Sequence, residues 1–317
     1  MGSGRTLRLA TRGSAQASAQ AGGVADALMA AHPGLAVELV FVETLGDQRT
    51  DVPLHSIGGQ GVFVKEVQRA VLDGAADFAA HSAKDLPSIT GEGLALAGFC
   101  RRRDPRDALV GARLADLPLG ATVASGSARR RAQLAVVRPD LRFVELRGNI
   151  ATRLGKLPEG GALVMAVAAL EILGLTERIA EALPVETFVP SPGQGCVALE
   201  CRAGDAEVAG LLAAVDHGPT RAAVEVERAF LAELGTGCSL PVAAHAVGDR
   251  LHGFLAAHSA DLHVTKSTGV AGAPSVDLHV TKWVGREVVL SGGPQQRLAQ
   301  AAGLARDLRD QLARAAE

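Results

Sequence analysis

A cluster of polar side chains follows directly on an apolar segment near residue 80. Residues Asp77–Ala80 are typical of a buried strand, and they run into His81–Asp85, which Pro87 closes. In an open α/β sheet, side chains at the carboxyl end of a strand face a crevice while the strand holds them still. Asp85 is our candidate for a central carboxylate, because beside Lys84 it stays ionised and can balance a developing positive charge. Taken alone, the cluster also fits an ordinary polar turn.

Two later junctions of the same kind present arginine. The segment Ser125–Arg131 follows a predicted strand and opens a helix with hydroxyl, backbone N–H and guanidinium groups, a combination that binds anions. The strand predicted at Leu141–Leu146 ends in Arg147–Asn149, and the next helix carries Arg153. Either junction alone would also fit a solvated basic helix face. Their repetition at equivalent points of one sheet predicts an anion site.

The N-terminal residues predict a strand, a loop and a helix. Residues Thr6–Thr11 alternate as a strand, Arg12 stands in the loop, and Ser14 is placed to cap the helix that follows. The irregular segment Leu45–Gly61 is rich in Gly, Asp, Pro and Ser and has no periodicity. It indicates either a mobile lid or a connector without fixed structure.

The four cysteines show no metal-site spacing. Cys100, Cys196, Cys201 and Cys238 form no CxxC pair and have no histidine partners at ligand intervals, which argues against zinc and against a disulfide framework. Cys196 and Cys201 belong to a predicted buried strand. Cys238 lies between glycine and proline, so it is predicted to stand on a loop. An accessible loop thiol can be a nucleophile or an attachment point, and an inert cysteine is the alternative.

Composition narrows the class of protein. A length of 317 residues suggests two or three domains, and 48% hydrophobic residues are ample for their cores. The net charge of −2 argues against a general binder of polyanions, although arginine outnumbers Asp and Glu from Arg101 to Arg153. Only 3% of the residues are aromatic, with no Tyr, so nucleic acid is not expected as a partner. No secretory leader and no long apolar run are present, so we expect a cytoplasmic protein without membrane contact.

Strands and helices alternate along most of the chain, which predicts an α/β protein. Further strands are expected at Glu186–Pro190 and Cys196–Cys201, and the glycine loop Ser191–Gly195 between them is interpreted as a return hinge. The hexapeptide Asp261–Lys266 recurs unchanged as Asp277–Lys282 and predicts a hairpin.

These motifs together resemble the porphobilinogen deaminase (hydroxymethylbilane synthase) family. The resemblance covers nearly the whole chain, and nine segments stand in family order: Ala10–Ser14, Gly58–Glu66, His81–Pro87, Arg103–Ala108, Ser127–Arg130, Leu146–Asn149, Pro192–Gly195, Glu227–Phe230 and Gly237-Cys238.

The resemblance implies a fold and an activity. The fold is α/β, with two periplasmic-binding-protein-like domains around a cleft and a smaller C-terminal α/β domain that has a short antiparallel sheet. The implied domains are 1–101 with 196–216, 102–195, and 217–317. The implied reaction joins four porphobilinogen molecules head to tail, with loss of ammonia, to give 1-hydroxymethylbilane. Family members carry a dipyrromethane cofactor on a cysteine that matches Cys238.

The resemblance also assigns roles to single residues. Asp85 and Lys84 would be catalytic, and Gly58, Gly59, Gly61 and Phe63 would belong to the lid. A further set would bind the cofactor and the substrate, since guanidinium groups are natural partners for the acetate and propionate arms of pyrroles. That set is Arg12, Ser14, Ser82, Lys84, Ser127, Arg129, Arg130, Arg147, Gly148, Arg153 and Gln194. No metal is expected.

The chain departs from the family pattern in three places. Leu170–Leu173 has no basic residue where many members have one, Thr236 replaces a common glycine before Gly237-Cys238, and the repeated hexapeptide lengthens the C-terminal region. A different class of protein, a non-catalytic two-lobed binder of organic anions, would share the hinge and the arginines. Such a binder has no use for Asp85 or for an exposed thiol at Cys238. We expect a monomer, because no large apolar helix face requires a partner.

Overall fold

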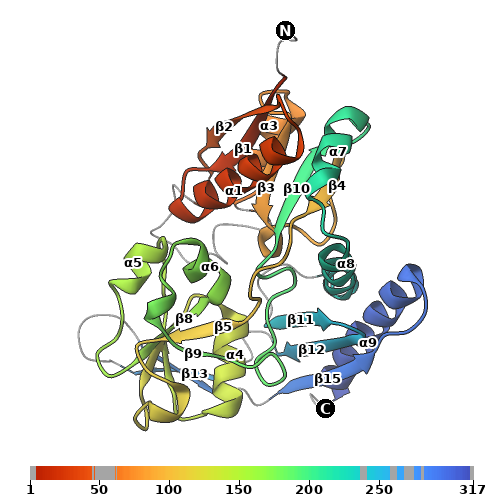
Figure 1. The fold of residues 1–317 in the computed structure, drawn as a ribbon. Helices are drawn as coiled ribbons and strands as arrows, with labels where there is room; N and C mark the ends of the chain where they lie inside the picture. The colour runs from red at the N-terminus through yellow and green to blue at the C-terminus, as the bar shows by residue number, and fades with distance from the viewer. Residues whose placement is uncertain are drawn as a thin grey trace.

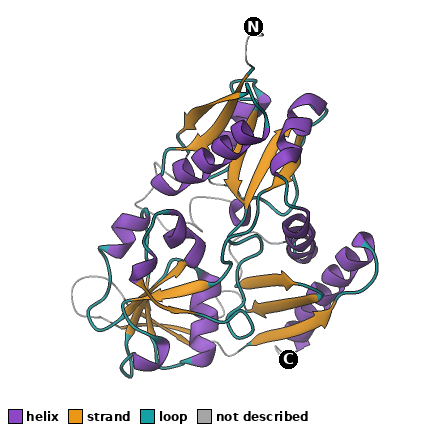
Figure 2. Ribbon diagram, in the orientation of Figure 1, coloured by secondary structure: helices purple, strands orange, loops and turns teal. Residues whose placement is uncertain are grey.

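The computed structural model of this chain describes residues 5–44, 46, 61, 63–235, 241–257, 263–267, 275–279 and 282–314. Within these residues the chain forms three units of helices packed on β-sheet, one standing above the other two in Figures 1 and 2. Among the helices described, none has the length and apolar character that crossing a membrane requires.

The upper unit contains a five-stranded sheet in the order β2-β1-β3-β10-β4. Its strands are β1 (Thr6–Arg12), β2 (Ala36–Val42), β3 (Phe78–Ser82), β4 (Leu94–Phe99) and β10 (Val197–Arg202). β1 pairs in parallel with β2 and β3, while β10 lies between β3 and β4 and runs antiparallel to both. A segment far along the sequence therefore completes the sheet that the N-terminal residues begin.

Helices cover both faces of this sheet. α1 (Ala15–Ala31) and α7 (Ala206–Leu212) pack on the face that carries Leu9 and Phe78, and α3 (Lys65–Leu72) packs on the face that carries Ala10 and Ala79. Because successive side chains of a strand point to opposite faces, the polar residues at the ends of β1 and β3 are also divided between the two layers.

The second sheet has seven strands in the order β13-β14-β7-β6-β8-β5-β9. Its central strands β6 (Thr122–Ala124), β7 (Arg142–Val144) and β8 (Ala162–Ala166) are parallel, and β5 (Asp107–Val110) and β9 (Ile179–Ala182) continue antiparallel. α4 (Ala128–Val137) packs on one face, and α5 (Ile150–Leu154) and α6 (Val167–Ile172) pack on the other.

The third unit is an antiparallel sheet of β11 (Val242–Val247), β12 (Arg250–Ala256) and β15 (Trp283–Val289). α8 (Gly218–Glu233) and α9 (Pro294–Arg314) cover it, and Phe230, Leu251 and Leu304 meet in their shared core. The 3₁₀ turns of the described chain are η2 (Ala83–Asp85), η3 (Leu114–Asp116), η4 (Thr176–Arg178) and η5 (Ala213–Val215). The expected α/β class, with two larger sheet units and a smaller C-terminal unit that has a short antiparallel sheet, is confirmed. Both larger sheets prove to be mixed.

Two crossover segments join the upper unit to the second sheet. They run side by side, because Cys100 N donates to Val197 O and Arg103 N donates to Gly195 O, each at 2.9 Å. The carboxylate of Glu227 on α8 accepts from Arg102 at 2.6 Å and from Gly193 N at 2.7 Å, so one buried side chain touches both segments. Through Glu227, the third unit therefore contacts the two segments that connect the other two units.

One expected strand is absent. Residues Glu186–Pro190 form a turn, and the edge strand is β9, a few residues earlier. Phe188 and Val189 are nevertheless buried. The side-chain amide of Gln133 donates to Val189 O at 2.9 Å and accepts from Val189 N at 2.7 Å, so it replaces the neighbouring strand that the apolar pattern suggested.

Residues 263–266 and 277–279 of the two hexapeptide copies belong to the expected hairpin, β13 (His263–Ser267) with β14 (Ser275–His279). We expected this hairpin within the C-terminal region. In the structure β14 pairs with β7, so the hairpin extends the second sheet. The exposed edge of β7 offers backbone groups that an added strand can pair with.

Candidate active site

The site is built around the turn that follows β3. Asp85 ends the 3₁₀ turn Ala83–Asp85, and Ala83 N donates to Cys196 O at 2.9 Å. Gly193 has φ +72, and a Cβ added there would lie 2.9 Å from the Cβ of Ala83 and 3.1 Å from Lys84 N. The return loop therefore lies directly against the turn, and glycine is required for this contact.

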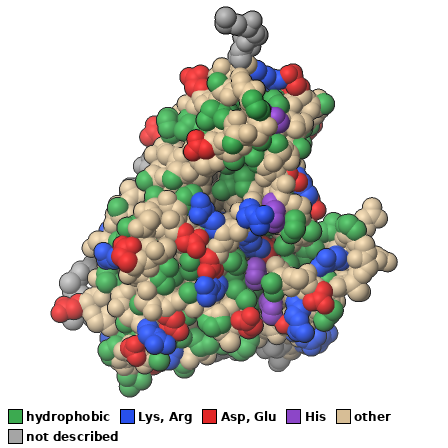
Figure 3. Space-filling view, in the orientation of Figure 1, with side chains coloured by type: hydrophobic (Ala, Val, Ile, Leu, Met, Phe, Trp, Pro, Cys, Tyr) green, Lys and Arg blue, Asp and Glu red, His purple; other side chains and the backbone are tan. Residues whose placement is uncertain are grey.

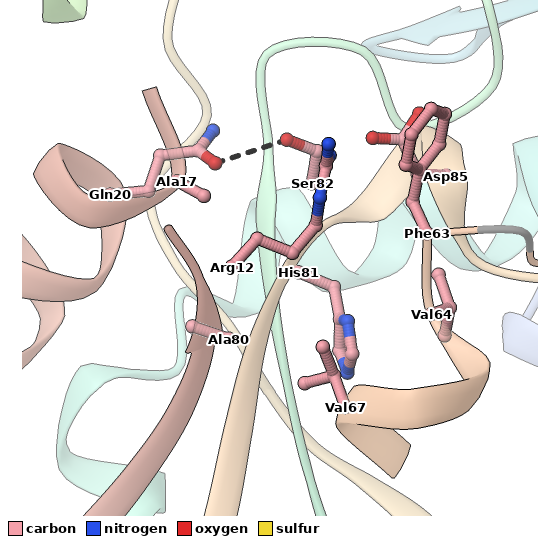
Figure 4. Close-up of a pocket in the computed structure, with 10 residues that line it drawn as sticks. All are labelled: Arg12, Ala17, Gln20, Phe63, Val64, Val67, Ala80, His81, Ser82 and Asp85. Carbon is pink, nitrogen blue, oxygen red and sulfur yellow. Dashed lines mark hydrogen bonds between the residues drawn. The ribbon is translucent and has the colours of Figure 1, made fainter. Parts of the chain in front are cut away.

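Ten residues line a pocket next to this turn, which spans about 330 Å³ including open solvent. They come from the ends of β1 and β3, from α1 and from the start of α3 (Figure 4): Arg12, Ala17, Gln20, Phe63, Val64, Val67, Ala80, His81, Ser82 and Asp85. Figure 3 shows charged and histidine side chains gathered on the molecular face where the three units meet. The pocket brings the predicted residues Arg12, Ser82, Asp85 and Phe63 together.

Strand alternation explains how the pocket is divided. Ser82 lies on the α1 face of the sheet, and its hydroxyl donates to Gln20 Oε1 at 3.1 Å. Arg12 lies on the α3 face, where its guanidinium stands over the ring of Phe63 at 4.1 Å from the ring centre. A cation over an aromatic face is held electrostatically, so Phe63 orients Arg12 toward the pocket.

A chain of polar groups, buried at Gln194 and Asp107, runs from the turn into the second sheet. Lys84 Nζ donates to Gln194 Oε1 at 3.5 Å, and Gln194 Nε2 donates to Asp107 Oδ1 at 3.0 Å and to Pro105 O at 2.7 Å. Burial, reinforced by the charge of Arg130, lowers the pKa of Lys84 to about 8, while Asp85 and Asp107 oppose that change. Charged groups of both units therefore affect the pKa of Lys84.

Arg129 and Arg130 share one carboxylate. The side chain of Asp107 is fully buried and lies 2.7 Å from Arg129 and 2.6 Å from Arg130. Burial alone would raise the pKa of Asp107, but the two arginine charges lower it to about 2. Arg129 also donates to Val189 O at 2.8 Å, and Arg130 donates to Val164 O at 3.1 Å. Their assignment as ligands of substrate carboxylates stays a prediction.

The junction after β7 holds the third group of predicted residues. Gly148 has φ +114, where an L side chain would be strained, and the side chain of Asn149 caps α5. Arg153 Nε donates to Gly148 O at 2.8 Å. Burial and the charges of Arg130 and Arg147 lower the pKa of Arg153 to about 10, and Asp85 opposes them. Arg153 therefore lies within electrostatic reach of the candidate carboxylate.

Two predicted hydroxyl ligands act as helix caps. Ser14 Oγ accepts from Ala17 N at 3.3 Å, which confirms the expected cap of α1, and Ser127 Oγ accepts from Arg130 N at 3.4 Å. The caps fix where both helices begin. Any contact of these hydroxyls with a ligand stays a prediction.

Several predicted residues lie outside the described part of the chain. Cys238, Gly58 and Gly59 are among them, whereas Gly61 and Phe63 are described and Gly61 has φ +81. Cys196 and Cys201 are buried, as expected. Burial raises the pKa of Cys196 to about 12 and raises that of Cys201, so neither thiol readily becomes a thiolate. Among the described residues no group of three or more His, Cys, Asp and Glu could hold a metal ion.

Sequence reasoning missed three residues of this region. Asp107 belongs to the Arg103–Ala108 motif, which could have drawn attention to it. His81 precedes the turn Ala83–Asp85 in its own motif but was given no role. Gln20 lies within an alanine-rich helix and carries no sequence signal, because only the packing of α1 on β3 brings it to Ser82.

Comparison with known proteins identifies the family. A family model described as porphobilinogen deaminase, dipyromethane cofactor binding domain, matches residues 7–210, and one described as the porphobilinogen deaminase C-terminal domain matches residues 221–266. A curated porphobilinogen deaminase of Acidothermus cellulolyticus is 51% identical over 247 residues, which cover 75% of this chain and 74% of the relative. The Roseiflexus castenholzii enzyme of the same name is 49% identical over 253 residues, covering 78% and 84%.

Solved structures add less. The methionine-binding protein MetQ aligns with a TM-score of 0.43 and 15% identity over 68% of this chain and 92% of its own, a likeness too weak to carry an argument. The two family models and the relatives at about half identity are decisive, because together they span the pocket, the crossover loop and the C-terminal unit. The chain belongs to the porphobilinogen deaminase family.

Proposed function

We propose that this protein condenses four porphobilinogen molecules, with loss of ammonia at each step, into linear 1-hydroxymethylbilane. The observation that carries the proposal is the pocket in which the Asp85 carboxylate and the Arg12 guanidinium meet at the ends of two neighbouring parallel strands. The curated relatives are enzymes by name, so the non-catalytic binder is not retained.

Asp85 stabilises the charge that the reaction creates. The aminomethyl group leaves from its protonated, ammonium form: when its C–N bond breaks, nitrogen takes the bonding electrons and departs as ammonia. The positive charge stays on the methylene carbon and spreads through the ring to the pyrrole N–H. A carboxylate that accepts this N–H lowers the energy of the cation. The short turn after β3 fixes the position of Asp85, because the backbone N–H of Ala83 donates a hydrogen bond to Cys196 O and the side chain of Ala83 lies against Gly193.

The basic residues hold the acid arms of the pyrroles. Arg12, Lys84 and Arg153 lie near Asp85. Arg129 and Arg130 on α4, and Arg147 in the loop after β7, extend this basic group in the second unit. Guanidinium groups bind carboxylates through paired hydrogen bonds, so a row of them can hold several arms in register. Ser14, Ser82, Ser127, Gly148 and Gln194 complete the proposed binding set.

The donor set also fits a dipyrromethane, whose acid arms need the same cationic partners. Arg12, Lys84, Arg129, Arg130, Arg147 and Arg153 would hold it, and Cys238 would carry it through a thioether. When bound, this group supplies the nucleophilic pyrrole carbon from which the chain grows. The fit is supported by Lys84, because a lysine whose pKa is lowered to about 8 by burial gains from an added carboxylate.

The organisation of the molecule is proposed along with its function. We assign residues 1–101 and 196–216 to domain 1, 102–195 to domain 2 and 217–317 to domain 3, with the β13–β14 hairpin crossing to the second sheet. We also propose a cytoplasmic monomer that acts without nucleic acid. Light scattering of the purified protein checks the oligomeric state.

Intact mass and turnover test the proposed function. Protein from cells that make porphobilinogen should be heavier than its sequence by a thioether-linked dipyrromethane, and it should consume added porphobilinogen while releasing ammonia. An unmodified mass together with no consumption would contradict the proposal.

A further inference from the structure

A buried polar cluster lies beneath the pocket and takes no part in the chemistry described above. His81 on β3 is 6% exposed and Glu200 on β10 is 1% exposed, and the two strands are antiparallel neighbours. His81 Nε2 lies 3.3 Å from Glu200 Oε2. Gln68 on α3 donates its side-chain amide to both oxygens of Glu200, at 3.1 and 2.9 Å. The cluster thus joins two strands and a helix through one carboxylate.

A carboxylate this deeply buried needs partners. A charge that leaves water without a partner is strongly destabilising, so the polar groups around Glu200 stabilise the fold by staying in contact with it. Arg228 of α8 also feels this charge: burial lowers the pKa of Arg228, and Glu200 opposes the change. Arg228 itself donates to Ser88 O at 3.1 Å. The groups that contact the carboxylate are therefore Gln68 and His81, while Arg228 adds a positive charge that acts on it from α8.

The geometry fixes which ring nitrogen of His81 carries a proton. Nε2 has no aligned hydrogen-bond partner among the described residues and faces Glu200 Oε2. A lone pair in that position would oppose a negative oxygen in a medium of low dielectric, where such repulsion is strong. Nε2 therefore bears a hydrogen, in either charge state of the ring.

The cluster is linked to the pocket through α3. Gln68 N donates to Val64 O at 2.8 Å, so the residue that binds Glu200 lies one helical turn after the start of the helix. Val64, Val67 and His81 line the pocket, and Phe63 lies beneath Arg12. In Figure 4 the ring of His81 points toward Val67, on the side of the pocket where α3 begins.

We propose that His81 is a positioning residue for porphobilinogen turnover: through Glu200 and Gln68 its Nε2–H holds the first turn of α3, which places Phe63 and thereby Arg12 beside Asp85. His81 touches no reacting atom in this proposal. It acts by keeping one wall of the pocket in register with the strand that ends in the catalytic turn. The proposal rests on the proposed function of the same pocket.

Two substitutions of His81 separate this role from general packing. His81→Gln places an amide N–H near the position of Nε2, whereas His81→Asn places one near Nδ1 and leaves Glu200 Oε2 without its contact from β3. We expect His81→Asn to lower kcat/KM for porphobilinogen at least about 10-fold, as for loss of a close polar contact with a buried charged group. We expect His81→Gln to stay within about 3-fold of the unmutated protein. His32→Asn is the matched control, because the ring of His32 binds Leu211 O at the C-terminal end of α1 and does not line the pocket.

Hydrogen exchange supplies a readout that needs no activity. Amides of residues 63–68 should exchange at least about 10-fold faster in His81→Asn and at the ordinary rate in His81→Gln. Glu200→Gln should give the same loss as His81→Asn, and the double variant should be no worse than either single one, because both act through one contact. Should His81→Asn fail to fold, Gln68→Met removes the helix donor at a partly exposed position and should reproduce the loss.

The outcomes are distinct. The proposal would be overturned if His81→Asn and His81→Gln had equal kcat/KM, or if the effects of the two substitutions in the double variant were additive. It would also be overturned by unchanged hydrogen exchange at residues 63–68, or by a Gln68→Met variant of normal activity. If the unmutated protein consumes no porphobilinogen, the proposed function fails, and the exchange experiment still decides whether His81 holds α3.

Discussion

Lys84 Nζ and Gln194 Oε1 lie 3.5 Å apart, and this contact joins the turn that carries Asp85 to the loop by which the chain returns to the first sheet. Gln194 also donates a hydrogen bond to Asp107 of β5, so Gln194 links the ammonium of Lys84 to a carboxylate of the second sheet. The turn Ala83–Asp85, the crossover and the arginine pair of α4 therefore form one connected electrostatic unit.

This connection predicts a pH limit. The pKa of Lys84 is lowered from 10.5 to about 8, chiefly by burial, so its charge is present below pH 8 and is lost above it. One pH unit higher, only about a tenth of the molecules keep the charge. We expect KM for porphobilinogen to rise between pH 8 and 9 in the unmutated protein and to stay level in Lys84→Arg. Parallel KM profiles of the two proteins would contradict this role of Lys84.

Removing the charge of Asp85 should affect the chemistry more than the fold. Asp85→Asn is expected to lower kcat at least about 100-fold, because a preorganised charge-stabilising group is lost. The melting temperature should change little, since Asp85 is only half-buried. Asp73→Asn is the control, because Asp73 pairs with Arg69 on the exposed surface of α3. Near-normal turnover of Asp85→Asn would exclude the proposed role.

Cofactor attachment should depend on a single thiol. Cys238→Ser is expected to have the mass of its sequence alone. Cys196 and Cys201 cannot substitute for it, because burial raises the pKa of Cys196 to about 12 and raises the pKa of Cys201. Intact mass spectrometry of Cys238→Ser checks this, with Cys201→Ser as the comparison. A loaded Cys238→Ser protein would place the attachment site elsewhere.

The shared carboxylate of Asp107 should stabilise the fold in a pH-dependent way. Its folded-state pKa, about 2, lies below its ordinary 3.8, so the stabilisation is complete above pH 4 and is lost as the pH falls through 2. Asp107→Asn leaves two buried guanidinium groups without their anion and should cost about 3 to 5 kcal/mol at pH 7. Urea unfolding at pH 7 and pH 2.5 tests this, because the difference between the two proteins should shrink at the lower pH. A difference that does not depend on pH would refute it.

Gly193 should prove more sensitive to substitution than Gly204, another glycine of positive φ. Gly193→Ala places a Cβ 2.9 Å from Ala83 and should displace the catalytic turn, whereas Gly204→Ala has φ +85 and meets nothing within 4 Å. Both substitutions carry a backbone cost of about 1 kcal/mol. Only Gly193→Ala is expected to lower kcat, by at least about 10-fold. Equal turnover of the two variants would show that the contact with Ala83 is unimportant.

Local pattern was enough to predict the elements on which the site stands. The apolar run before His81 indicated β3 and the turn after it, and Ser14 was recognised as the cap of α1 because capping depends on residues three positions apart. Periodicity failed at Glu186–Pro190, since it reports burial and cannot tell a strand from a turn held by the amide of Gln133.

Tertiary structure alone decided the partners. Asp107 with Arg129 and Arg130, and His81 with Glu200 and Gln68, are contacts between residues far apart in the sequence. The sequence determined the residue types and the strand ends at which they stand, because those depend on near neighbours. Which charges neutralise one another depends on how sheets and helices pack, and β10 shows this most clearly, since it brings Glu200 beneath a pocket begun by the first strand of the chain.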